Sequence, residues 1–127
     1  MAEGKFATVI NCMDGRTQIP AIELMKKQFG VDYVDSITEP GPIKAMAEGE
    51  DKPQIESIKR RVEISIKKHG SAAVGIVAHF DCAGNPVEKK EQLIQLDKSV
   101  ELVKSWGYNV TVLKIWIDEN WQGYALN

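Results

Sequence analysis

Short apolar runs alternate with amphipathic segments along the chain, and this alternation limits the folds that are open to it. Four runs are rich in β-branched or small apolar residues and are typical of buried strands, at 6–10, 31–37, 72–78 and 110–117. Between and after them, apolar residues recur at helical spacing over about 19–29, 43–48, 55–69 and 88–106. This order predicts βαβ units, and therefore a three-layer α/β/α fold around a four-stranded, mostly parallel sheet.

The length and charge of the chain narrow its organisation and its partners. With 127 residues we expect a single domain over 1–127, with the last ten residues as an irregular tail. Acidic and basic residues are interspersed and the formal net charge is −2, so nothing favours nucleic acid as a partner. No apolar run approaches the roughly 20 residues that cross a bilayer. The N-terminus also lacks a signal-peptide pattern, so we expect a cytoplasmic protein with reduced thiols and no membrane partner.

Polar turns after two of the expected strands carry the residues best suited to chemistry. Cys12 follows the first strand, and His79 and Cys82 follow the strand at 72–78. Ligands of parallel sheets bind beyond the carboxyl ends of the strands, so these side chains can converge if the two strands are neighbours. Two thiolates and one imidazole suit Zn²⁺ in a tetrahedral site with one open position. A chance occurrence remains an alternative here, because H-x-x-C is a weak motif by itself.

Asp14 and Arg16 extend the first turn to the pattern C-x-D-x-R. Together with the H-x-x-C of His79 and Cys82, this pattern resembles the β-class carbonic anhydrases. The resemblance implies a sheet order of 2-1-3-4 and one Zn²⁺ bound by Cys12, His79 and Cys82. It also implies catalytic roles for the first pair: Asp14 accepts a hydrogen bond from metal-bound hydroxide or moves in as a fourth ligand, and Arg16 holds Asp14 away from the metal.

The function that this resemblance implies is the hydration of CO₂ to bicarbonate by a zinc lyase, and it implies a homodimer or a higher homo-oligomer. Two other functions stay open: hydrolysis of a related small molecule such as COS or CS₂, and a non-catalytic zinc-binding or ligand-sensing role. For the residues themselves, Asp14 and Arg16 can be a solvated ion pair in a turn. In a metal-free site, Cys12 and Cys82 can form a disulfide or a sulfenic-acid switch.

The sequence departs from the family pattern around the expected site. The first strand begins close to Met1, so we expect no N-terminal helical extension. The family's Arg-Asn-Ala-Gly-like loop is replaced by Thr-Glu-Pro-Gly-Pro at 38–42, which we expect to be irregular. After Cys82 the glycine comes one position later than usual, as Gly84. The resemblance therefore bears more strongly on metal binding than on the identity of the substrate.

For His69 and the three tryptophans the sequence indicates structural roles. His69 precedes Gly70 at an expected helix end, where an imidazole interacts favourably with the helix dipole. The three tryptophans are expected in the core or at a subunit interface, or alternatively in a pocket wall, and are Trp106, Trp116 and Trp121. The segment 40–42, the short helix after it and the tryptophan-rich C-terminus offer apolar surface, which also favours a homodimer.

Overall fold

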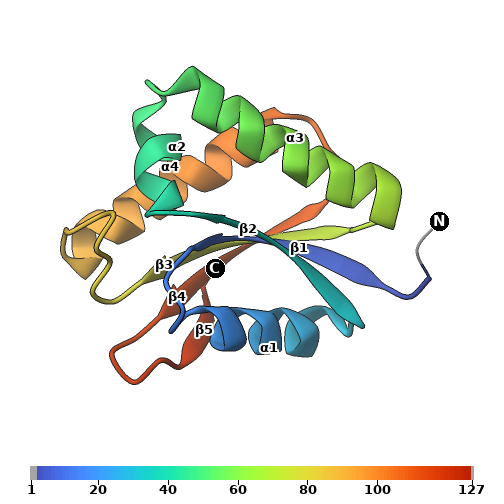
Figure 1. Ribbon diagram of the computed structural model, residues 1–127, viewed down its shortest axis with the longest axis horizontal. Coiled ribbons are helices and arrows are strands. Elements are labelled where there is room, and N and C mark those ends of the chain that lie inside the picture. Colours follow the sequence, from blue (N-terminus) through green and yellow to red (C-terminus); the bar gives the residue numbers. More distant parts are fainter. Residues whose placement is uncertain (1–2, 127) are drawn as a thin grey trace.

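The computed structural model describes residues 3–126, which build a five-stranded sheet in the order β2-β1-β3-β4-β5 (Figure 1). The strands are β1 (Phe6–Cys12), β2 (Tyr33–Glu39), β3 (Ala73–His79), β4 (Thr111–Ile117) and β5 (Gly123–Leu126). The first four pair in parallel, and β5 pairs antiparallel with β4. The α/β class, the mostly parallel sheet and the order 2-1-3-4 of its first four strands are confirmed.

The prediction of an irregular tail and of only four strands is wrong, because residues 123–126 form β5 and give the sheet a fifth strand. The preceding turn is closed by Asp118, whose carboxylate accepts hydrogen bonds from the backbone N–H groups of Asn120 and Gln122, both at 3.0 Å. Four residues are too few to show a periodic pattern. The strand forms because β4 offers it an edge to pair with, and this long-range cause leaves no local signal.

Four helices cover the two faces of the sheet: α1 (Gln18–Phe29), α2 (Pro42–Glu48), α3 (Lys52–His69) and α4 (Lys89–Ser105). Figure 1 shows α1 on one face and the other three helices on the opposite face, which confirms the three layers. The carboxylate of Asp51 caps α3 by accepting from the N–H of Gln54 at 3.1 Å, and this helix ends before Gly70 as predicted. No helix within residues 3–126 has the length and apolar character to span a membrane.

The central strands β1 and β3 are buried on both faces, as their continuous apolar runs predicted. Ile10 and Ile76 point into a cluster shared with α2, α3 and α4, whereas Val9 and Val77 point into the cluster under α1. Trp116 belongs to the first cluster and is 5% exposed. Much of the apolar surface that we expected around α2 and the C-terminus is therefore covered within the chain.

The strands β1, β2 and β3 end one or two residues later than their apolar patterns indicated. Thr38 and Glu39, expected in an irregular loop, continue β2 because they pair in register with Asn11 and Cys12 of β1. The Glu39 carboxylate is held by the guanidinium of Arg61. Strand pairing extends these strands through polar residues whose backbone groups find partners. As a consequence, Cys12 is the last residue of its strand and is not in a turn.

His69 lies in the last turn of α3, as expected, and its side chain also joins a hydrogen-bonded group. Its Nδ1 is 2.6 Å from the Asp35 carboxylate, which also accepts from the Ser65 hydroxyl at 2.7 Å. Thr8 of β1 donates to the same serine at 2.6 Å, and the His69 ring stacks on Phe6. This group anchors α3 to β1 and β2.

Candidate metal centre

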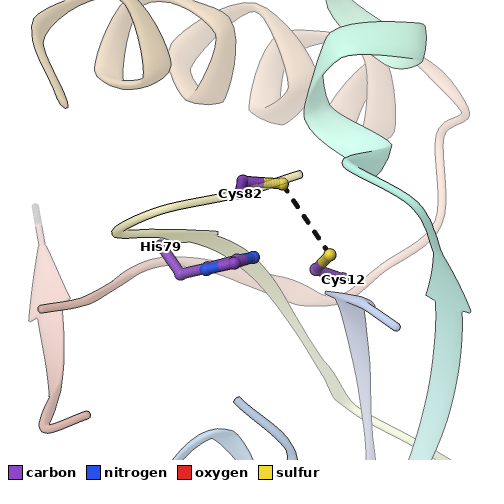
Figure 2. A group of neighbouring side chains, drawn as sticks. All are labelled: Cys12, His79 and Cys82. Carbon is purple, nitrogen blue, oxygen red and sulfur yellow. Dashed lines mark hydrogen bonds between the residues drawn. The ribbon is translucent and has the colours of Figure 1, made fainter. Parts of the chain in front are cut away.

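The sheet topology brings Cys12, His79 and Cys82 together (Figure 2). Cys12 ends β1, His79 ends the neighbouring parallel strand β3, and Cys82 follows in the next turn. The order of strands reverses between β1 and β3, and such a switch point is where open α/β sheets bind ligands. The two sulfurs and a ring nitrogen all lie within 4.8 Å of one another, so the convergence expected from the sequence is present.

The three side chains are nearly closed off from solvent, with exposed fractions of 4% for Cys12, 1% for His79 and 5% for Cys82. Both cysteines are free thiols, and their sulfurs are 3.8 Å apart, linked by a hydrogen bond (Figure 2). Two sulfurs and one nitrogen in a buried site form a donor set that can hold a metal ion such as Zn²⁺.

The orientation of the His79 ring leaves one nitrogen available. Nδ1 lies 2.7 Å from the backbone carbonyl of Phe80, and a carbonyl oxygen can only accept, so Nδ1 carries the proton. In neutral imidazole Nε2 then carries the lone pair, and this buried atom makes no hydrogen bond within the described part of the chain. A backbone carbonyl bound to one ring nitrogen is the usual way in which a metal-ligating histidine is oriented. The ring therefore fits the role of a ligand.

The two thiols differ in their proton affinity. The hydrogen bond with Cys82 lowers the pKa of Cys12, helped by the backbone of Gly41 and Asp14, against the opposing effect of burial. The hydrogen bond with Cys12, together with burial, raises the pKa of Cys82. Of the two thiols, Cys12 therefore gives up its proton more readily. Binding of a metal through both sulfurs would release the protons that they still carry.

Gln92 and Gln95 of α4 support the site, and no sequence pattern pointed to them. The Gln92 amide accepts from the N–H of His79 at 3.1 Å and donates to the carbonyl of His79 at 2.7 Å. One turn further, Gln95 exchanges two hydrogen bonds with Asn85, which lies in the turn of Cys82. All three amide side chains are buried, so α4 holds both segments that carry ligand candidates. Buried glutamines at i and i+3 on an apolar helix face are the signal that could have found them.

Gly41 and Gly84 let two loops meet backbone to backbone. A Cβ on Gly84 would lie 2.7 Å from the carbonyl carbon of Pro40, and a Cβ on Gly41, at φ +57°, would lie 2.9 Å from Gly84. No side chain fits between the loops. The Pro-Gly-Pro segment therefore forms a wall of the site against the Cys82 turn, and the Gly41 backbone lowers the pKa of Cys12.

Asp14 and Arg16 form a two-pronged ion pair beside this group. Arg16 donates from Nη2 to Oδ2 at 2.7 Å and from Nε to Oδ1 at 3.1 Å, and its backbone N–H also reaches Oδ1 at 2.9 Å. These hydrogen bonds lower the pKa of Asp14 to about 2, so the carboxylate is ionised at neutral pH. Asp14 does not belong to the group formed by the two sulfurs and the imidazole. In this structure the carboxylate is engaged by Arg16.

An open groove of about 920 Å³ reaches the site from the side of Cys82. Its walls combine apolar side chains with acidic ones. The lining includes Phe80, Cys82, Val87, Trp116 and Tyr124. Cys12 and His79 do not line it. A small molecule entering the groove would thus approach the group from its Cys82 edge.

Comparisons with known proteins bear on the family and the fold of the chain. The family model described as "Putative carbonic anhydrase" matches residues 2–127. No curated protein matches the sequence significantly. Among solved structures, the chain is similar to a mutant of the β-carbonic anhydrase CafD of the filamentous fungus Aspergillus fumigatus. The sequence identity is 14% and the TM-score 0.57, over 99% of this chain and 91% of that chain. This likeness concerns the fold.

Proposed function

This chain belongs to the putative carbonic anhydrase family, and on that premise we propose that it binds one Zn²⁺ and hydrates CO₂ to bicarbonate. The observation that carries the proposal is the convergence of Cys12, His79 and Cys82, with the Nε2 of His79 buried and without a hydrogen bond in the described structure. Zn²⁺ held there would supply a Lewis acid that lowers the pKa of a coordinated water towards about 7. The rest of the chemistry belongs to the side chains.

Cys12 and Cys82 would bind the metal as thiolates, and His79 through Nε2. The lowered pKa of Cys12 favours it as the first sulfur ligand, and the raised pKa of Cys82 means that metal binding has to displace its proton. Gln92 fixes the backbone of His79, and the Phe80 carbonyl fixes its ring. A ligand set held in this way loses little conformational freedom on binding.

Asp14 would act as the acceptor that orients the nucleophile. Its carboxylate stays ionised because Arg16 lowers its pKa, and an ionised carboxylate accepts hydrogen bonds without giving up a proton. The two-pronged hydrogen bonding also fixes its direction. Arg16 would keep the carboxylate outside the ligand group, which leaves one metal position for the reaction. The apolar part of the groove would admit a small uncharged substrate such as CO₂.

Metal analysis with X-ray absorption tests the ligand set. We expect close to one zinc per chain with two sulfurs and one nitrogen. The His79→Ala, Cys82→Ser double variant should lose the metal, whereas His69→Ala, which changes the chain's other histidine, should keep it. Zinc retained by the double variant would contradict the assignment.

A stopped-flow assay from about pH 6 to about pH 9 tests the reaction. Hydration of CO₂ above the uncatalysed rate is expected of the zinc-loaded protein. A protein that binds zinc and shows no hydration would refute the proposed activity. Assays with COS and CS₂ would then separate a related hydrolase from a non-catalytic zinc-binding or ligand-sensing protein.

We also propose that residues 1–127 work as one domain, in the cytoplasm, and as a homodimer or a higher homo-oligomer. The exposed apolar side chains beside the groove support assembly, since Phe80, Val87 and Tyr124 are 45%, 38% and 49% exposed. A reducing compartment would keep Cys12 and Cys82 as thiols. Light scattering at micromolar concentration measures the oligomer, and a monomer alone would overturn that part of the proposal.

A further inference from the structure

Arg16 is held by groups from two other segments besides Asp14. Its guanidinium lies over the Trp121 ring, with Cζ 4.1 Å from the ring centroid. Its edge donates to Asp81, from Nη2 to the backbone carbonyl at 3.2 Å and from Nη1 to the carboxylate at 3.4 Å. The Arg16 side chain is 46% exposed, and an exposed arginine without such neighbours would be free to turn. Contacts from the Cys82 turn and from the β4–β5 hairpin restrain it instead.

The backbone at both contacts is in an unusual conformation. Asp81 has φ +56° and Trp121 has φ +59°, and they are the only non-glycine residues with positive φ among those that the structure describes. Asparagine and aspartate enter this region readily, but for a tryptophan it is a genuine outlier. Strained residues persist where the surrounding structure holds them, and they gather at functional sites. Here both of them contact the same guanidinium.

The hairpin is built to hold Trp121 in place. Asp118 closes the turn from both sides, with its carboxylate bound to two backbone N–H groups and its carbonyl accepting from the N–H of Trp121 at 3.0 Å. The indole is partly buried and packs against the cluster under α1. It also lies beside the ring of His79, at 6.3 Å between centroids. Trp121 is therefore a fixed surface at the edge of the candidate metal centre.

We propose that Trp121 is a positioning residue, which fixes the guanidinium of Arg16 and through it the carboxylate of Asp14. The catalytic consequence rests on the proposed function, in which Asp14 orients the nucleophile. The contact between Trp121 and Arg16 is independent of that function. Arg16 uses Nε and Nη2 for Asp14, so a rotation about its side chain breaks both hydrogen bonds at once. The indole face blocks that rotation on one side, and cation–π attraction favours the bound orientation.

Hydrogen exchange of the Arg16 Nε–H, followed by NMR, tests the contact without any use of activity. In Trp121→Leu the exchange should be faster by about twofold to fivefold, the scale of an exposed cation–π contact. Trp121→Phe, with a smaller aromatic face, should give an intermediate value. Trp106→Leu is the matched control, because it makes the same change in a partly buried tryptophan at the far end of α4 and should leave the exchange unchanged. Equal exchange in Trp121→Leu and in the parent would overturn the proposal.

A double-mutant cycle then tests the route of the effect on the reaction. Trp121→Leu should lower the rate constant of hydration by about twofold to fivefold at unchanged zinc content. In an Arg16→Met background the same change should not lower the residual rate any further, because the group through which Trp121 acts is gone. An equal loss in both backgrounds would show that Trp121 does not act through Arg16. A parent without hydration would refute the proposed function, while the exchange measurement would still decide the contact.

Discussion

The side-chain amide of Gln92 binds both polar groups of the His79 backbone, accepting from the N–H at 3.1 Å and donating to the carbonyl at 2.7 Å. Helix α4 thereby supplies hydrogen-bond partners for the backbone of the last residue of β3, which is 1% exposed. A buried backbone group without a partner is costly, so this side chain decides where the last residue of β3 can lie.

Gln92→Leu should destabilise the protein and weaken metal binding. The change leaves two buried backbone groups of His79 unpaired, at about 1–3 kcal/mol each. A less well-held histidine should also bind zinc about tenfold to a hundredfold more weakly. Denaturant unfolding and a zinc competition assay measure the two effects. Gln28→Leu on the exposed face of α1 is the control and should change neither, and a Gln92→Leu protein that matches it would contradict this role.

Gly84→Ala should separate the two loops at the site, because its Cβ would meet backbone atoms of Pro40 and Gly41 at 2.7 and 3.0 Å. Backbone cannot move aside as a side-chain end can, so we expect a loss of about 1–3 kcal/mol in stability and a lower zinc content. Gly15→Ala is the matched control, since nothing lies within 4 Å of the added Cβ. Thermal unfolding with metal analysis would show the difference, and equal behaviour of the two variants would speak against a close-packed loop contact.

Asp14→Ala should keep its zinc, because three ligand candidates remain, and should lose rate. The loss of one preorganised acceptor corresponds to about tenfold to a thousandfold in the hydration step. Steady-state kinetics at constant zinc content measures it. A variant as fast as the parent would show that Asp14 and Arg16 form only a surface ion pair without a catalytic role.

Arg16→Ala should also keep zinc and lose activity, for a different reason. Without the guanidinium the Asp14 carboxylate loses its side-chain partner and becomes free to enter the open metal position. A crystal structure of the zinc-loaded Arg16→Ala protein should then show a carboxylate oxygen of Asp14 on the metal, at the position that stays open to water in Asp14→Ala. Identical metal coordination in the two variants would exclude this explanation.

Tyr108 should be among the last phenols to ionise. Burial, and the hydrogen bond of 2.6 Å that its hydroxyl donates to Glu63, raise the pKa of Tyr108 to about 12. A pKa raised in the folded state means that this pair stabilises the fold fully below pH 10, and that the contribution is lost as the pH rises through about 12. Ultraviolet titration should show a step near this pH that is absent in Tyr108→Phe and present in Tyr33→Phe. The same step in all three proteins would contradict the assignment.

Local patterns were sufficient for the frame of this protein. Continuous apolar runs identified β1 and β3 as strands buried on both faces, and helical spacing with a following Gly70 located α3. Because the carboxyl ends of parallel strands share one edge of a sheet, the positions of Cys12 and His79 along the chain already implied that they can meet if their strands are neighbours. The resemblance added the roles that we propose for Asp14 and Arg16.

Contacts between distant segments decided the rest. The strand β5 exists because β4 presents an edge, and it brings the hairpin that carries Trp121 onto Arg16, 105 positions earlier in the chain. Gln92 and Asp81 gain their roles in the same way, from backbone groups and a guanidinium that other segments place beside them. A side chain that acts through one long-range hydrogen bond has no period or spacing of its own. Only the packed structure can therefore assign such a residue to the site.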